Sequence, residues 1–136
     1  MTILSLLISA VLALIALVHA LWGFGIWVPI RNEEALAHAV VGARGVTRMP
    51  GPIPCFLVVA GLVAVIIAIW AQAGLFRSVI LWGAAVVFLG RGLIAFMKFW
   101  RGMAPVEPFA TNDRRFYGPL SLSLAVGLLL VIWGGI

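Results

Sequence analysis

Six side chains are candidates for a functional site because they are polar or ionisable and lie within or beside long apolar runs. They are His19, Trp22, Arg91, Asp113, Arg115 and Tyr117. Trp22 follows His19 by three residues, so a helix would place both rings on one face, one turn apart. We expect His19 to be a neutral histidine that hydrogen-bonds between helices. The set combines a fixed positive charge, a carboxylate and aromatic polar groups, which suits the binding of an anion or an amphiphile.

Arg91 is the costliest of these residues because it interrupts an apolar run from about residue 78 to 99. A charge inside a membrane must reach the headgroups or find partners. Three outcomes are open: the side chain extends to the surface, it pairs with Asp113 or Glu107 if the third loop folds inward, or it holds an external anion such as a lipid phosphate or a carboxylate. His19 lies at about the same depth, roughly 4–6 Å from the midplane. We therefore expect the guanidinium to point into the bundle near His19.

Asp113, Arg115 and Tyr117 alternate along the chain between prolines that argue against a continuous helix. An extended backbone would place the three side chains on one side. This spacing predicts a salt bridge between Asp113 and Arg115, capped by the tyrosine hydroxyl, that latches the third loop at the membrane surface.

Several chemistries find no support in the sequence. No Asp or Glu lies inside the four predicted spans, which disfavours a proton- or sodium-coupled antiporter of the acidic type. A single histidine within a span cannot supply a bis-histidine haem site. Cys55 is the only cysteine, so neither an internal disulfide nor a thiolate cluster can form. We predict no catalytic residue, no metal site and no cofactor.

The elements that must position these residues are four apolar helices. Hydrophobic residues make up 65% of the 136 residues, charged residues only 10%, and the mean hydropathy is +1.23. Each apolar run is long enough to cross a bilayer as a helix, and we expect the first to be a retained span because no basic residue precedes it. The sequence predicts an all-α integral membrane four-helix bundle, a single domain over 1–136, with spans at about 3–27, 53–73, 78–99 and 119–136.

The loops indicate orientation and partners. Seven basic residues lie in or beside the first and third loops, against Arg77 alone on the opposite side. This bias predicts that these two loops are cytoplasmic and that both termini lie outside. Tryptophans near the span ends, among them Trp100, fit an aromatic belt. Asn32, followed by two glutamates, predicts a short interfacial helix in the first loop. The net charge of +5 is assigned to topology and anionic lipid headgroups, and no nucleic-acid partner is predicted.

Two stretches of the sequence resemble a known family. They are His19-Ala20-Leu21-Trp22-Gly23 followed by Pro29, Val41-Gly42 and Met49-Pro50, and Asp113-x-Arg115-x-Tyr117-x-Pro119-Leu120. Together they resemble a family of small bacterial four-span membrane proteins known only as a domain of unknown function. The resemblance implies a bacterial inner-membrane location and no established activity. Arg91 matches a family arginine, but Ala95 stands where the family has an acidic residue shortly afterwards, so the resemblance implies that an Arg–acid pair is missing here.

Two functions follow from these expectations. The first is a non-enzymatic accessory or interaction protein that binds a lipid or amphipathic anion near Arg91, alongside a partner membrane subunit or a second copy of itself. The alternative is a small membrane enzyme or carrier. Its pocket would face the cytoplasm and be lined by His19, Trp22, Arg91, Asp113 and Tyr117.

Overall fold

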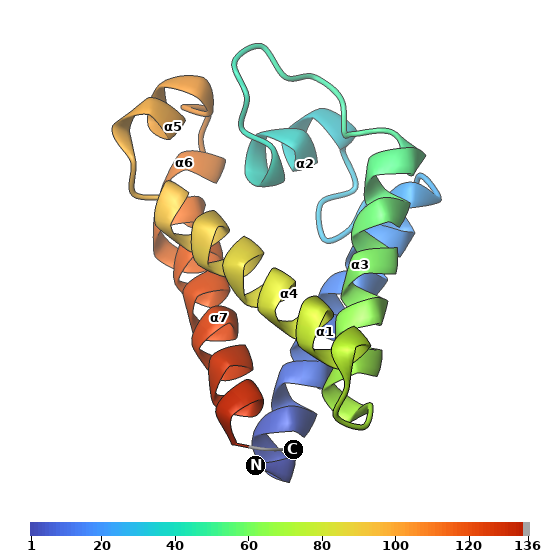
Figure 1. Cartoon of the computed structure of the whole chain (residues 1–136). Coiled ribbons are helices and arrows are strands. Elements are labelled where there is room, and N and C mark those ends of the chain that lie inside the picture. Colours follow the sequence, from blue (N-terminus) through green and yellow to red (C-terminus); the bar gives the residue numbers. More distant parts are fainter. Residues whose placement is uncertain (135–136) are drawn as a thin grey trace.

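The computed structural model describes residues 1–134, and within them the chain is entirely helical apart from its connections (Figure 1). Four helices are long and apolar enough to span a membrane, as the sequence predicted. The elements in chain order are α1 (Thr2–Gly23), α2 (Glu33–Val40), α3 (Pro52–Trp70), α4 (Leu75–Ile94), α5 (Lys98–Met103), α6 (Phe109–Asn112), the π-helix η1 (Asp113–Tyr117) and α7 (Gly118–Trp133).

The long helices form two antiparallel pairs, α1 with α3 and α4 with α7. Figure 1 shows the pairs converging at the end that carries the N-terminus and the α3–α4 turn, here called the terminal end. They diverge toward the opposite end, which carries α2, α5 and α6 and is here called the loop end. The bundle is therefore a wedge that is wider at the loop end.

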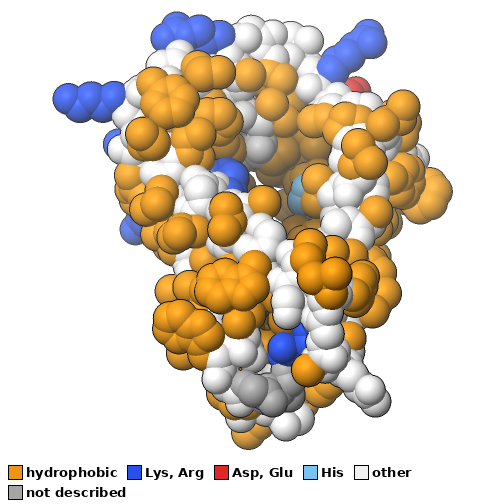
Figure 2. All heavy atoms as spheres, viewed as in Figure 1, with side chains coloured by type: hydrophobic (Ala, Val, Ile, Leu, Met, Phe, Trp, Pro, Cys, Tyr) orange, Lys and Arg blue, Asp and Glu red, His pale blue; other side chains and the backbone are white. Residues whose placement is uncertain are grey.

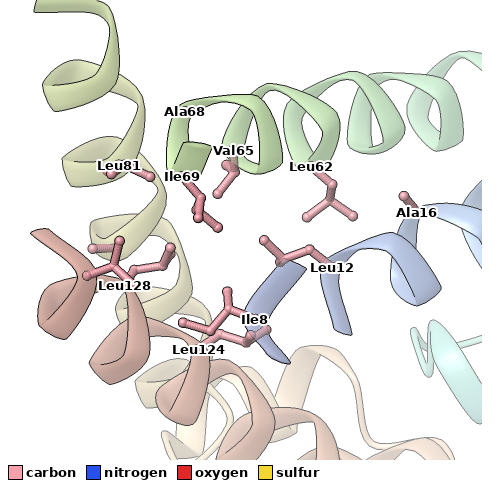
Figure 3. Packing of buried hydrophobic residues seen from close by; sticks show 12 residues of the cluster. Ile8, Leu12, Ala16, Leu62, Val65, Ala68, Ile69, Leu81, Leu124 and Leu128 are labelled. Carbon is pink, nitrogen blue, oxygen red and sulfur yellow. The ribbon is translucent and has the colours of Figure 1, made fainter. Parts of the chain in front are cut away.

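The core that joins the two pairs is made of aliphatic side chains from all four long helices (Figure 3). Leu12, Leu81 and Leu128 are completely enclosed. Small residues permit the close approach of helices: a Cβ on Gly92 of α4 would lie 2.9 Å from the backbone nitrogen of Leu122 in α7. Leucines on the outer faces remain exposed, as expected where lipid is the surrounding solvent.

The short helix α2 confirms the expectation of a helix in the first loop. The Asn32 side chain accepts a hydrogen bond from the amide of Ala35 at 2.9 Å and caps its N-terminus. Its buried face, Leu36 and Ala37, packs with Met49 and with partly buried apolar side chains including Trp22. As a result α2 packs at the loop end against Trp22 of α1, and it also contacts α6.

The boundaries of all four spans differ from those predicted. The second helix ends at Trp70 and not at 73, and the third runs from Leu75 to Ile94 and not from 78 to 99. The first helix ends at Gly23, short of Trp27, because Gly25 adopts a positive φ of 77° that breaks the helix. The fourth helical run begins at Phe109 and continues to Trp133, well before the predicted start near Pro119.

This early start contradicts the predicted extended backbone over Asp113–Tyr117. The segment is a π-helix embedded between α6 and α7. Proline normally breaks a helix because it lacks an N–H and its ring meets the carbonyl four residues back. A π-turn already departs from the regular hydrogen-bond ladder at this point, so Pro119 follows it without ending the helix.

Four charged residues that the sequence placed in or beside loops therefore lie in the long helical runs: Arg77 in α4, and Asp113, Arg114 and Arg115 in η1. Arg77 is in the first turn of α4, is only 8% exposed, and has Nη2 3.5 Å from the carbonyl oxygen of Val131. Asp113 lies in the run from Phe109 to Trp133 and is completely buried. The expectation that no acidic residue belongs to a span is wrong for Asp113.

Candidate functional site

A cavity of about 890 Å³ lies between the two helix pairs where they diverge. Figure 2 shows the hollow, with a histidine and a basic side chain on opposite walls. Its volume is within the range of roughly 300–1,000 Å³ that is usual for small-molecule sites. On α4 the lining extends from Val79 to Arg91. At about 1.5 Å per residue this is about 18 Å, a little over half of a hydrocarbon core of about 30 Å.

The cavity is apolar along most of its length and polar at one end. Aliphatic and aromatic side chains and glycines from all four long helices form the apolar part, among them Leu14, Leu62, Gly83, Phe88 and Leu124. The polar side chains are His19 and Trp22 near the end of α1, Arg91 near the end of α4, Tyr117 at the end of η1 and Ser121 in the first turn of α7. All five lie toward the loop end because each belongs to the loop-end part of its helix.

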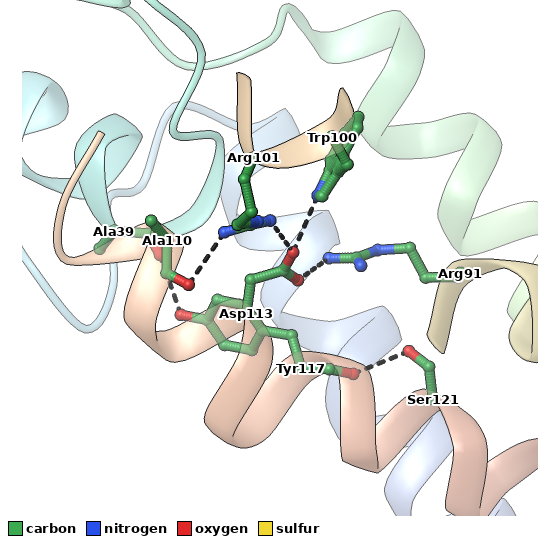
Figure 4. A network of polar contacts seen from close by, with 8 residues as sticks. All are labelled: Ala39, Arg91, Trp100, Arg101, Ala110, Asp113, Tyr117 and Ser121. Atoms are coloured by element: carbon green, nitrogen blue, oxygen red, sulfur yellow. Dashed lines mark hydrogen bonds and ion pairs between the residues drawn. The ribbon is translucent and has the colours of Figure 1, made fainter. Parts of the chain in front are cut away.

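Arg91 reaches an acidic partner from the loop end. Its Nη2 donates to Oδ1 of Asp113 at 2.5 Å (Figure 4). Of the three outcomes open for Arg91, the structure shows the inward fold of the third loop, with Asp113 and not Glu107 as the partner. The Arg–acid pair that the resemblance implied to be missing is present, and its acid comes from η1 and not from position 95.

Asp113 has two further partners that the sequence analysis missed. Nη2 of Arg101 donates to Oδ2, and Nε1 of Trp100 donates to the same oxygen at 2.9 Å. Arg101 also donates to the carbonyl oxygen of Ala110 at 2.9 Å, which ties α5 to α6. In the sequence, Arg101 was counted as a loop charge and Trp100 as a belt residue. The sequence shows only that Trp100 and Arg101 precede Asp113 by 13 and 12 residues, and the fold of α5, α6 and η1 is needed to bring them together.

Arg115 does not belong to this group. It is exposed, two residues from Asp113 on the π-helix, and its guanidinium lies 5.9 Å from the centre of the Phe116 ring. The predicted salt bridge between Asp113 and Arg115 is therefore wrong. Residues four apart share a helix face, so Asp113 and Tyr117 point inward together. The Tyr117 hydroxyl donates to the carbonyl oxygen of Ala39 at 3.0 Å and joins α2 to the fourth run.

The polar end keeps a net positive charge. Arg91, Arg101 and Asp113 together carry one excess positive charge, because one carboxylate faces two guanidinium groups. Nη1 of Arg91 is buried without a hydrogen-bond partner within residues 1–134. A buried donor left unpaired costs free energy, about 1–3 kcal/mol. This enclosed nitrogen is out of reach of a ligand, but Arg91 lines the cavity and its side chain is 35% exposed, so an anion in the cavity can balance the charge.

The titratable side chains near the polar end differ in their access to the cavity. Asp113 is enclosed by three donors and does not line the cavity, whereas His19, Arg91 and Tyr117 do. In the described part of the chain, no three His, Cys, Asp or Glu side chains gather in a way that could hold a metal ion. Four of the five predicted pocket residues line the cavity: His19, Trp22, Arg91 and Tyr117. Asp113 does not line it but binds Arg91.

Comparison with known proteins gives the family of this chain. The family described as "Protein of unknown function (DUF3995)" matches residues 12–128. The chain belongs to the DUF3995 family. This match confirms the resemblance to a domain of unknown function, and it includes every candidate residue from His19 to Tyr117. No curated protein and no solved structure matches this DUF3995 chain significantly.

Proposed function

We propose that this protein is a non-enzymatic accessory membrane protein that binds an anionic amphiphile, with its head beside Arg91 and a hydrocarbon chain in the cavity. One observation carries the proposal: a single cavity has an apolar length and a cationic end. Its polar end faces the loop end of the bundle, where the headgroups of that leaflet would lie. A lipid of this leaflet therefore enters in the orientation it already has in the bilayer.

The energetics favour this occupant. Each buried methylene contributes about 0.8 kcal/mol, so a chain gains stability along the apolar walls when it displaces water. The gain in free energy is smaller when the hydrocarbon chain comes from surrounding lipid and not from water. The selectivity for one lipid over another then depends on its headgroup. A guanidinium offers a planar fork of donors that suits phosphate and carboxylate oxygens.

We propose further that the loop end faces the cytoplasm of a bacterial inner membrane and that both termini lie outside. Basic residues at the loop end support this orientation, since cytoplasmic loops are enriched in Lys and Arg. They are Arg31, Arg44, Arg48, Lys98, Arg101, Arg114 and Arg115. The amphiphile would then come from the inner leaflet, where anionic lipids attract these side chains.

The proposal is tested by blocking the cavity. Gly83 lines it, and a Cβ at this position meets nothing within 4 Å, so Gly83→Phe should fill the space without disturbing the fold. Gly90 lies on the same helix, also has free space and does not line the cavity, so Gly90→Phe is the matched control. Native mass spectrometry of delipidated protein should show dioleoylphosphatidylglycerol bound to wild type and to the control, and lost from Gly83→Phe. Equal binding of zwitterionic dioleoylphosphatidylcholine, or equal binding by both variants, would refute the proposal.

A carrier or small enzyme is the second candidate, and one observation favours it. A smaller cavity of about 150 Å³ shares His19, Trp22, Val40 and Val58 with the main one and continues to Pro54 at the start of α3. The two cavities together give the site a route toward the loop end. Reconstituted vesicles that move a fluorescent phosphatidylglycerol between leaflets, or change it chemically, would favour this candidate over stable binding.

An accessory role implies a protein partner, and we propose a second membrane subunit or a second copy of this chain. The apolar outer faces of the long helices are the surface available for such contact. Cross-linking in membranes, followed by mass measurement of the adducts, distinguishes a self-adduct from a complex with another subunit.

A further inference from the structure

The tautomer of His19 is fixed by its local contacts. Nδ1 lies 2.8 Å from the carbonyl oxygen of Ile15, one turn earlier in α1, so its hydrogen bond lies within one helix and not between helices as expected. A carbonyl oxygen can only accept a hydrogen bond, so Nδ1 must carry the hydrogen. The neutral ring therefore presents Nε2 as a bare acceptor.

Trp22 holds this ring in place. The two ring centres are 4.8 Å apart with a tilt of 55°. The indole is itself anchored, because Nε1 donates to the carbonyl oxygen of Val28 at 2.8 Å. His19 is thus held by a hydrogen bond on one side and an aromatic contact on the other, and its direction does not depend on a ligand.

Nε2 of His19 is available to an occupant of the cavity. It has no hydrogen-bond partner within residues 1–134, and it is absent from the enclosed polar atoms of this part of the chain. The side chain lines both the main and the smaller cavity. A ligand group beside Nε2 must donate a hydrogen bond to make use of it.

Arg91 offers the opposite chemistry from another helix. A guanidinium carries donors only, so it requires an acceptor and prefers an anionic one. Among its nitrogens, only Nη2 has a partner in the described chain, and that partner is Asp113. The polar end of the cavity therefore combines a cationic donor on α4 with a neutral acceptor on α1.

We infer that the head of the bound amphiphile carries both an anionic oxygen and a free hydroxyl, as in a glycerol phosphodiester lipid. This inference rests on the proposed function and specifies the ligand of that same site. The phosphodiester oxygen accepts from Arg91, and a glycerol hydroxyl donates to Nε2 of His19. A carboxylate or a plain alkyl phosphodiester satisfies only Arg91, because at neutral pH neither has a hydrogen to donate.

Two lipids with the same chains and charge separate these cases. Dioleoylphosphatidylglycerol has free hydroxyls in its head, and dioleoylphosphatidylethanol has none. Affinities are measured by native mass spectrometry on the delipidated full chain at pH 8. We expect wild type to prefer the glycerol lipid by about 3- to 10-fold, the range that one neutral hydrogen bond supplies.

Variants at position 19 assign the preference to this residue. His19→Phe keeps a ring of similar size without the acceptor, and the ratio of the two affinities should fall to about one. His19→Gln supplies an amide oxygen as an acceptor and should keep part of the preference. It is the control that distinguishes loss of the acceptor from a general loss of structure. A ratio of one in wild type would overturn the inference. So would a preference that survives His19→Phe.

The outcomes also distinguish this inference from the proposed function. If both anionic lipids bind equally and more tightly than dioleoylphosphatidylcholine, the anionic site stands and the hydroxyl assignment fails. If neither anionic lipid exceeds the zwitterionic one, the proposed function fails and this inference fails with it.

Discussion

Replacing Asp113 by asparagine should be one of the most damaging single changes in the chain. The carboxylate is completely buried and receives hydrogen bonds from Arg91, Arg101 and Trp100. An asparagine has nearly the same shape but no charge, and its amide hydrogens would face cationic donors. Two guanidinium groups would then be left without an anion.

The magnitude follows from the burial of the partners. Breaking a buried ion pair by removing one partner typically costs about 3–5 kcal/mol. The side chain of Arg101 is 17% exposed and that of Arg91 is 35% exposed, so more of the loss comes from Arg101. At about 2–4 °C per kcal/mol, the melting temperature in detergent should fall by about 6–20 °C.

The assay is thermal unfolding followed by circular dichroism in one detergent. Arg115→Gln is the matched control because Arg115 lies on the same π-helix but is exposed, and it should change stability by less than about 0.5 kcal/mol. Arg101→Gln should cost more than Arg91→Gln. The Asp113→Asn/Arg101→Gln double variant should lose less than the sum of the singles, because residues in contact are not additive. Equal losses from Asp113→Asn and Arg115→Gln would refute the buried network.

Three further predictions concern topology and packing. A cysteine at Arg44, in a Cys55→Ser background, should resist a membrane-impermeant thiol reagent in intact cells, and labelling from outside would reverse the proposed orientation. Tyr117→Phe should lower stability by about 0.5–1.5 kcal/mol and speed amide exchange selectively in α2, because it removes the hydrogen bond to that helix; unchanged exchange there would contradict this coupling. Gly92→Val should cost about 1–3 kcal/mol through overpacking against α7, measured by the same melts, whereas Gly90→Ala on the same helix has free space and should be neutral or stabilising.

The sequence was sufficient to predict the elements that depend only on neighbouring residues, namely the four spans and the short helix α2. An apolar run of span length is sufficient evidence for a membrane helix, since only a helix satisfies its own backbone within lipid. The helix α2 could also be predicted from the sequence, because Asn32 is an N-cap and the following glutamates suit a helix N-terminus. Both features need no knowledge of the rest of the chain.

The site was harder to predict because its contacts join distant segments. Arg91 and Asp113 are 22 residues apart, and nothing in their spacing indicates a pair. The alternation of Asp113 and Arg115 was interpreted with the period of a strand, whereas the segment is a π-helix that separates them. Arg91 and His19 were found because polar side chains in apolar surroundings are costly, and this argument does not depend on register. Trp22 followed from its helical spacing to His19, whereas Tyr117 was identified through the alternation that the π-helix contradicts.

The wedge shape of the bundle has a consequence for the surrounding bilayer. Because the helix pairs diverge toward the loop end, the protein occupies more area in the leaflet on that side than in the other (Figure 1). A flat bilayer must stretch or tilt its lipids to match such a body, whereas a bilayer that is convex on the loop side matches it with less distortion. We therefore expect the molecule to partition toward membrane regions of that curvature.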